Sequence, residues 1–209
     1  MEVKQREGGR PSILAVSNSL TLPAMPRRTR KAKPSVFQLL ITLKEVEAPV
    51  WRRLLVPSDI SLGELHLALN EAMGWTNSHL HQFRFEDRVF GDPDFDQDGE
   101  FEDERTVQLD ALAGVGDRFG YEYDFGDDWG HEVKVEKRLP LDERCVYPMC
   151  IGGARACPPE DCGGPLGYER LLEALLNDDE DELVAWVGGF FDPDGFDVNR
   201  TNQALRNGP

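Results

Sequence analysis

The chain has 209 residues, of which 40% are hydrophobic and 30% are charged, and its formal net charge is −16. This length allows one complete hydrophobic core with at most a small appendage, and the hydrophobic content excludes a wholly disordered protein. The best apolar run, over residues 36–43, is too short to span a membrane, and no apolar leader follows Met1. We therefore expect a soluble, cytoplasmic protein without a membrane partner.

Charge is divided unevenly along the chain. Residues 1–34 hold eight lysines and arginines against two glutamates, a net charge of +6, which leaves −22 for residues 35–209. A body this acidic repels phosphate backbones, so we expect no nucleic-acid binding through the folded domain. The basic segment is predicted to be a disordered, solubilising tail, or alternatively an arm that contacts an anionic partner. Met25 is an alternative natural start, so whether residues 1–24 belong to the natural product stays open.

The first half of the predicted domain contains two strands and a helix. Apolar residues alternate with polar ones from Phe37 to Leu43, and a second strand is expected over residues 50–56. Ser61 and Glu64 have the spacing of a capping box, which predicts a helix start. The helix has one apolar face and ends at Gly74.

The second half adds strands and then helices. A strand is predicted over residues 79–85, an acidic loop over 92–104, and an aromatic hairpin over 119–125 and 129–135. A loop rich in Pro, Gly and Cys covers residues 140–165, and helices are expected after Pro165, around 183–187 and over 198–206. The predicted fold class is α+β: a mixed or antiparallel sheet with a ββαββ core and a C-terminal helical flank, forming one domain over residues 35–209.

Two histidines and the hairpin turn form the first candidate metal constellation. His79 and His81 are two residues apart on a predicted strand, so both rings project from one face. They would hold one ion together with a third ligand and leave an open position for water, as a metal hydrolase requires. The third ligand would come from His131, Asp124, Asp127 or Asp128. Alternatively, His131 is a buried structural histidine and Asp127-Asp128 satisfies a turn.

The cysteines form a second candidate site. Cys150, Cys157 and Cys162, preceded by Cys145, lie in an irregular loop where a structural zinc ion would supply order. Three of these cysteines with His131 are a further ligand set. Free thiols in a packed loop, or a disulfide, are the alternatives.

The acidic loop resembles the first half of a calcium-binding loop. Asp94, Asp96 and Asp98 have the spacing of oxygen ligands, and Gly99 follows at the usual position. Arg105 stands where a bidentate glutamate is expected, which favours a solvated acidic loop over a calcium site.

Four ordered motifs carry a family resemblance: residues 49–53 (PVWRR), 74–83 (GWTNSHLHQF), 123–131 (YDFGDDWGH) and 158–164 (PPEDCGG). The sequence resembles the plasmid pRiA4b ORF-3-like family from residue 37 to residue 205. The family occurs in bacteria and archaea, often on mobile genetic elements, and some members are labelled resolvase-like. A serine resolvase needs a nucleophilic serine in an arginine-rich site and a basic DNA-binding region, which this acidic domain lacks.

The leading functional hypothesis is a non-enzymatic binding module for a protein or a small molecule. Its polar and aromatic groove would be lined by residues that gather near strand ends: Trp75, His79, His81, Asp124, Asp127, Asp128, Trp129 and His131. The alternative is a metal-dependent hydrolase that uses the His/Asp site. A third hypothesis is a mobile-element accessory protein that contacts DNA through the basic arm. Glu160-Asp161 is expected to cap the following helix, with a carboxylate at a cleft as the alternative.

Overall fold

The computed structural model describes residue 1 and residues 33–96, 99–177, 182–188 and 191–208. The chain divides into two units, Met1–Ala32 and Lys33–Pro209, and the helices and strands of the described residues all belong to the second unit. The basic tail expected over residues 1–34 lies, apart from its ends, outside the described residues.

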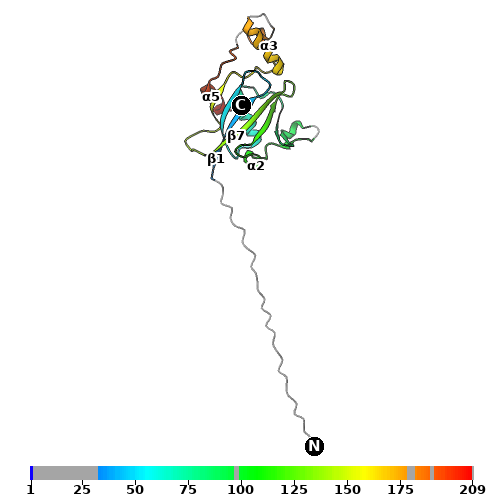
Figure 1. Ribbon diagram of the computed structural model, residues 1–209, viewed down its shortest axis with the longest axis vertical. Coiled ribbons are helices and arrows are strands. Elements are labelled where there is room, and N and C mark those ends of the chain that lie inside the picture. The colour runs from blue at the N-terminus through cyan, green and yellow to red at the C-terminus, as the bar shows by residue number, and fades with distance from the viewer. Residues whose placement is uncertain (2–32, 97–98, 178–181, 189–190, 209) are drawn as a thin grey trace. The chain divides into compact units, whose positions relative to one another are not determined.

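A single sheet forms the body of the domain (Figure 1). Its strand order is β5-β4-β3-β6-β7-β1-β2-β8, with β4 and β5 parallel and every other neighbouring pair antiparallel. The strands are β1 (Ser35–Leu43), β2 (Trp51–Pro57), β3 (His81–Phe85), β4 (Arg88–Gly91), β5 (Glu102–Asp103), β6 (Arg118–Tyr123), β7 (Trp129–Pro140) and β8 (Met149–Ala154). The α+β class with a mixed sheet is thus confirmed.

Helix α1 (Leu62–Met73) begins and ends as its sequence predicts. The Ser61 side chain accepts from the Glu64 amide, and the Glu64 side chain accepts from the Ser61 amide, which completes the capping box. Gly74 ends the helix at φ 99°, a left-handed conformation that glycine adopts without a Cβ clash. The apolar face of α1 is buried in the core.

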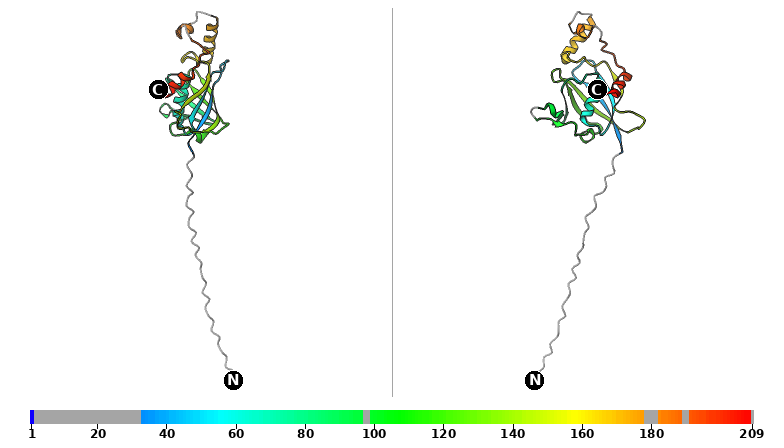
Figure 2. Two further views of the ribbon diagram at one scale, coloured as in Figure 1. Left: turned by 90° about the vertical axis from the view of Figure 1, so that its left-hand side faces the viewer. Right: turned by 180° about the vertical axis from the view of Figure 1, so that it is seen from behind.

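Of the other helices in the described residues, two short ones precede β6 and three follow β8. They are a 3₁₀ turn (Pro93–Phe95), α2 (Leu109–Leu112), α3 (Gly164–Asn177), α4 (Glu182–Trp186) and α5 (Val198–Asn207). Helix α5 lies beside β8 (Figure 2). The side-chain NH2 group of Asn202 donates to the Cys150 carbonyl, and its side-chain oxygen accepts from the Cys150 backbone amide. None of the helices in the described part of the chain has the length and apolar character needed to cross a membrane.

The core is most aromatic where β3, β6 and β7 pair. Tyr121 and Tyr123 of β6 are fully buried with Trp129 of β7 and Phe83 of β3. Successive inward residues of neighbouring strands place these rings side by side, as in Phe83–Tyr121, whose centroids are 4.9 Å apart. This rigid aromatic layer supports the polar residues that follow the strand ends.

Candidate functional site

A cavity of about 950 Å³ opens between α1, the segment before β3 and the β6–β7 turn. Its far wall comes from the β4–β5 segment, where the Phe101 ring lies so close to Gly91 that a Cβ there would stand 2.6 Å from the ring. The polar lining residues include His66, Asn77, His79, His81, Glu104 and Asp124, and the apolar part includes Leu80, Phe95, Phe101 and Phe125. Several of the predicted groove residues therefore share one pocket.

The base of the pocket holds a stacked pair of histidines. The His66 and His81 rings are parallel within 2°, and their centroids are 3.3 Å apart. His81 Nε2 lies 2.7 Å from Glu104 Oε2, and both side chains are almost fully buried. A buried carboxylate without a donor is costly, so this hydrogen bond fixes the orientation of both groups.

His66 is held by two neutral partners. Its Nε2 lies 2.6 Å from Asn77 Oδ1 and its Nδ1 2.8 Å from the Tyr121 hydroxyl. Because the amide oxygen only accepts, Nε2–H donates to it and Nδ1 accepts from the hydroxyl. Burial, with a smaller effect of neighbouring His81, lowers the pKa of His66 to about 3, so this ring is neutral at physiological pH.

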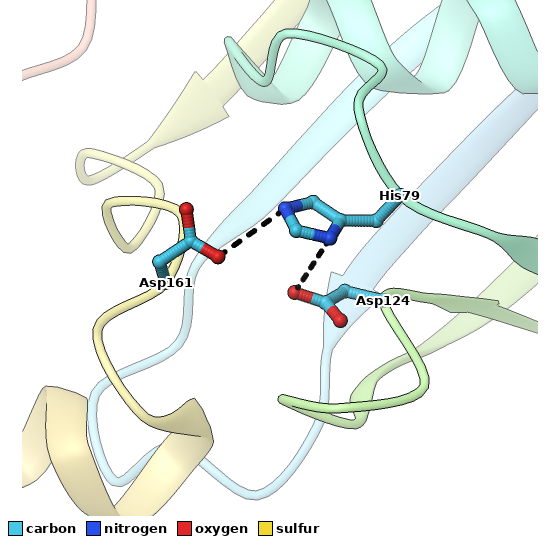
Figure 3. Close-up of side chains that lie close together, drawn as sticks. All are labelled: His79, Asp124 and Asp161. Atoms are coloured by element: carbon cyan, nitrogen blue, oxygen red, sulfur yellow. Dashed lines mark ion pairs between the residues drawn. The ribbon is translucent and has the colours of Figure 1, made fainter.

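His79 lies between two aspartates on the pocket wall (Figure 3). Its Nδ1 is 3.5 Å from Asp124 Oδ2, and its Nε2 is 3.4 Å from Asp161 Oδ1. The three residues come from the segment before β3, the end of β6 and the loop before α3. Among the described residues, they are the one group in which three His, Cys, Asp or Glu ligand atoms lie within 4.8 Å of one another.

Local hydrogen bonds hold these carboxylates in place. Asp124 has φ 60°, and its Oδ1 accepts from the Gly126 amide, so Oδ2 is left facing His79. Glu160, next to Asp161, accepts from the Thr76 amide and hydroxyl and from the Tyr123 hydroxyl. Glu160 therefore ties the loop before α3 to the segment that carries His79, in place of the predicted helix-capping role.

Three residues of the predicted groove belong to the core instead. Trp75, Trp129 and His131 are buried, and the Trp75 indole donates to the Pro158 carbonyl. Burial lowers the pKa of His131 to about 4, and its Nδ1 lies 3.3 Å from the Tyr121 carbonyl. The groove prediction misplaced these residues because inward positions of β7 and the aromatic contacts of Trp75 draw them into the core. Neither His81 nor His131 joins His79 in a metal-ligand group of the described residues, so the predicted pairing of His79 with His81 around one ion is not observed.

The two turn aspartates lie outside the pocket lining. Asp127 Oδ2 accepts from the Gly163 amide just before α3, and Asp128 is exposed at φ 56°. The turn alternative describes both residues better than metal ligation does, because Asp127 accepts from a backbone amide and Asp128 occupies an αL position, which favours Asp and Asn.

The cysteines do not assemble into a metal-ligand group. All four are free thiols, and Cys150, Cys157 and Cys162 share no group of three ligand atoms among the described residues. Burial raises the pKa of each of these three thiols, that of Cys162 to about 12. The positions of these cysteines in the described part of the chain favour the free-thiol alternative over a shared zinc site.

The predicted calcium loop is engaged by protein groups. Asp94 pairs with Arg105 at 3.0 Å, and Asp96 accepts from the Gly99, Glu100 and Phe101 amides. Asp98 lies outside the described residues. Asp94 and Asp96 therefore match the alternative of a solvated acidic loop. In that loop, the hydrogen bonds that the Asp96 carboxylate accepts shape the turn.

Sequence reasoning did not identify His66 as a pocket residue and did not assign Glu104 or Asp161 to their partners. One signal for His66 was available, since a histidine within the apolar face of a helix, beside Leu62, Leu65 and Leu69, needs a buried polar partner. The pairings of Glu104 and Asp161 depend on long-range contacts that no local pattern contains.

Comparisons with known proteins agree with the motifs. A family model described as "Plasmid pRiA4b ORF-3-like protein" matches residues 35–200. The uncharacterised protein y4hQ of Sinorhizobium fredii is 41% identical over 177 residues, which cover 82% of this chain and 91% of that protein. The crystal structure of a protein of unknown function from Methanosarcina mazei Go1, MM3350, is similar with a TM-score of 0.75 and 34% identity, covering 82% of this chain and 98% of that chain. This chain belongs to the plasmid pRiA4b ORF-3-like family.

Proposed function

We propose that this domain is a binding module that takes small organic cations into the pocket between α1, β3 and the β6–β7 turn. The observation that carries the proposal is the joint presence of carboxylates and exposed aromatic rings around one cavity of about 950 Å³. Sites for small molecules occupy roughly 300–1,000 Å³ and combine an apolar lining with a few convergent polar groups.

The charge of the lining supports a cationic ligand. The lining includes the carboxylates of Glu64, Asp92, Glu104 and Asp124. Arg105, the one arginine or lysine among the described lining residues, already pairs with Asp94 and Asp103. The net charge of −22 over residues 35–209 draws cations toward such a cleft.

The apolar lining is placed where it would contact a ligand. Phe95 is 62% exposed, Phe125 39% and Leu80 42%, and all three border the cavity. Large apolar side chains that gather at one opening indicate a binding surface, whereas scattered ones do not. Aromatic faces also attract organic cations, by roughly 0.5–1 kcal/mol at exposed sites.

A metal-dependent hydrolase is the second candidate, and the His81–Glu104 pair favours it. A carboxylate that holds one imidazole nitrogen orients the ring as a general base, provided that the other nitrogen reaches the substrate. In this alternative the metal ligands are His79 and Asp124 with Asp161, because His131 is buried in the core. Turnover that needs both His81 and metal would favour the hydrolase over the binding module.

The proposal is tested with three probes of matched size: benzylamine, benzyl alcohol and benzoate. Isothermal titration of the full chain is expected to show benzylamine binding at least about tenfold tighter than the neutral alcohol, with benzoate weakest, because only the amine complements the carboxylates. Phe125→Ala is expected to weaken benzylamine binding. Val146→Ala, an exposed apolar residue outside the pocket lining, is the matched control. Equal affinity for the three probes, or equal loss in both variants, would overturn the proposal.

A further inference from the structure

We propose that His79, Asp124 and Asp161 bind one divalent transition-metal ion at the pocket wall, with zinc the best-matched ion. The inference deepens the proposed function. It rests on that function only where it assigns the metal a role in ligand binding, because two of the three proposed metal ligands line the same pocket. His79 and Asp124 line that pocket, and Asp161 approaches from the loop before α3 (Figure 3).

One ligand atom from each of the three residues lies within 4.8 Å of the other two, so small side-chain movements would bring them to the spacing of a zinc site. Zinc bonds of about 2.0–2.1 Å at tetrahedral angles separate neighbouring ligand atoms by about 3.3 Å. The nitrogen–oxygen distances from His79 are 3.5 Å to Asp124 and 3.4 Å to Asp161. Each distance involves a different ring nitrogen, so binding requires the imidazole to turn until one nitrogen points between the carboxylates. Asp161, with a side chain 68% exposed, has room to follow.

The protein positions the two carboxylates differently. The Asp124 side chain is only 10% exposed, and its Oδ1 accepts from the Gly126 amide while Oδ2 faces His79. The backbone beside Asp161 is held by Glu160, whose carboxylate accepts from Thr76 and Tyr123. Outer hydrogen bonds of this kind orient metal ligands and raise metal affinity.

The donor set selects among metal ions. One imidazole nitrogen and two carboxylate oxygens suit zinc, iron and manganese, whereas calcium and magnesium prefer oxygen ligands alone. Two carboxylates also balance the charge of a divalent ion. Three protein ligands leave at least one position open for water or for an oxygen or nitrogen donor of the pocket ligand. The ligand class then becomes an organic cation that carries such a donor, for example an amino alcohol.

The test is titration of the full, untagged chain with zinc chloride, followed by isothermal calorimetry and by elemental analysis after dialysis. We expect one zinc ion per chain, with manganese binding more weakly and calcium binding more weakly still. Asp124→Asn and Asp161→Asn are expected to reduce zinc affinity by more than about tenfold. Both positions have positive φ (60° and 59°), which asparagine tolerates, so these variants keep the local backbone.

Two matched variants control for general effects of lost charge and for thiol binding. Asp128→Asn removes an exposed carboxylate at φ 56° from the same turn, and Cys150→Ser removes a buried thiol outside the cluster. Both are expected to bind zinc as the unmodified chain does. Absence of zinc binding, or equal weakening in Asp128→Asn and Asp124→Asn, would overturn the site, and so would loss of zinc only in Cys150→Ser.

The metal-site inference and the organic-cation proposal can be disproved independently of each other. Benzylamine titration in EDTA tests the pocket without metal, and zinc titration tests the cluster without ligand. Benzylamine binding without zinc binding would remove only the metal inference, whereas zinc binding without benzylamine binding would remove only the cation-binding function.

Discussion

The imidazole rings of His66 and His81 lie parallel, with centroids 3.3 Å apart. His66 belongs to α1 and His81 begins β3, so the stack joins helix and sheet at the base of the pocket. Burial is the main cause that keeps His66 neutral, and repulsion between two imidazolium rings at this distance would add to it. The polar base of the pocket thus depends on one neutral ring between Asn77 and Tyr121.

Stability is expected to fall as pH falls below about 6.5. The folded pKa values of His66 and His131 are about 3 and about 4, below the unfolded value of roughly 6.5, and burial is the main cause of both shifts. Their contribution is therefore fully present above pH 6.5 and is lost as pH falls toward these folded values. In that window, each histidine reduces the free energy of unfolding by about 1.4 kcal/mol per pH unit, because only the unfolded chain takes up its proton.

Urea unfolding at pH 7, 6 and 5 measures this dependence, with His131→Gln as the test variant. The free energy of unfolding of the variant is expected to change less steeply with pH than that of the unmodified chain. The difference in slope is about 1.4 kcal/mol per pH unit at the lower end of this range. Identical slopes would show that the pKa of His131 is not lowered in the folded chain.

The buried His81–Glu104 pair is expected to be important for stability. His81→Ala leaves the Glu104 carboxylate buried without the donor at 2.7 Å, and breaking a buried pair in this way costs about 3–5 kcal/mol. Chemical denaturation measures the loss. The double variant His81→Ala/Glu104→Ala is expected to recover part of it, because the unpaired carboxylate is then absent.

The matched comparison for this pair is Arg88→Ala, which removes the partner of the exposed Glu102 in the neighbouring part of the sheet. An exposed carboxylate is hydrated when its partner is lost, so unfolding of this variant is expected to resemble that of the unmodified chain. A loss in Arg88→Ala as large as in His81→Ala would contradict the distinction between the two pairs.

A substitution in the aromatic layer of β3, β6 and β7 is expected to reduce stability more than a substitution in the C-terminal helices. Trp129 is fully buried, and Trp129→Ala is expected to lower the free energy of unfolding by about 3–5 kcal/mol because it leaves a large cavity. Trp186 of α4 is 52% exposed, and Trp186→Ala is expected to have a much smaller effect. Thermal unfolding of the two variants checks the order, and the reverse order would place the core elsewhere.

Glu160 is expected to act on the metal cluster through the backbone. Glu160→Ala removes acceptors for the Thr76 amide, the Thr76 hydroxyl and the Tyr123 hydroxyl, so the loop carrying Asp161 loses its tie to the segment carrying His79. Zinc affinity is expected to fall by roughly tenfold, an outer-sphere effect, as measured by calorimetry. Unchanged affinity would mean that Asp161 is positioned without Glu160.

Local patterns account for much of the fold. The capping box at Ser61, the left-handed Gly74 and the alternation in β1 and β6–β7 each act over a few residues, and each was predicted correctly. Strand β8 was missed because Gly152 and Gly153 interrupt its pattern, and its pairing with β2 is long-range. Strands β4 and β5 were missed because they are short and border the acidic loop.

The candidate site was less predictable than the fold. His79, His81 and Asp124 were expected to line a groove, and they line the same cavity. Which residues would contact them depended on tertiary contacts, so Glu104 was not assigned to His81, and Asp161 was expected to be part of a helix cap. His131 illustrates the opposite error, since its motif suggested function while its inward position on β7 buries it.

The function proposed for the pocket between α1, β3 and the β6–β7 turn is the binding of small organic cations. The most direct measurement is a nitrogen-15 NMR titration of the full chain with benzylamine. We predict saturable shifts of the backbone amides of His79, His81 and Phe125, and no comparable shifts with benzyl alcohol at the same concentrations. Shifts spread over the surface, or equal shifts with both probes, would contradict the claim.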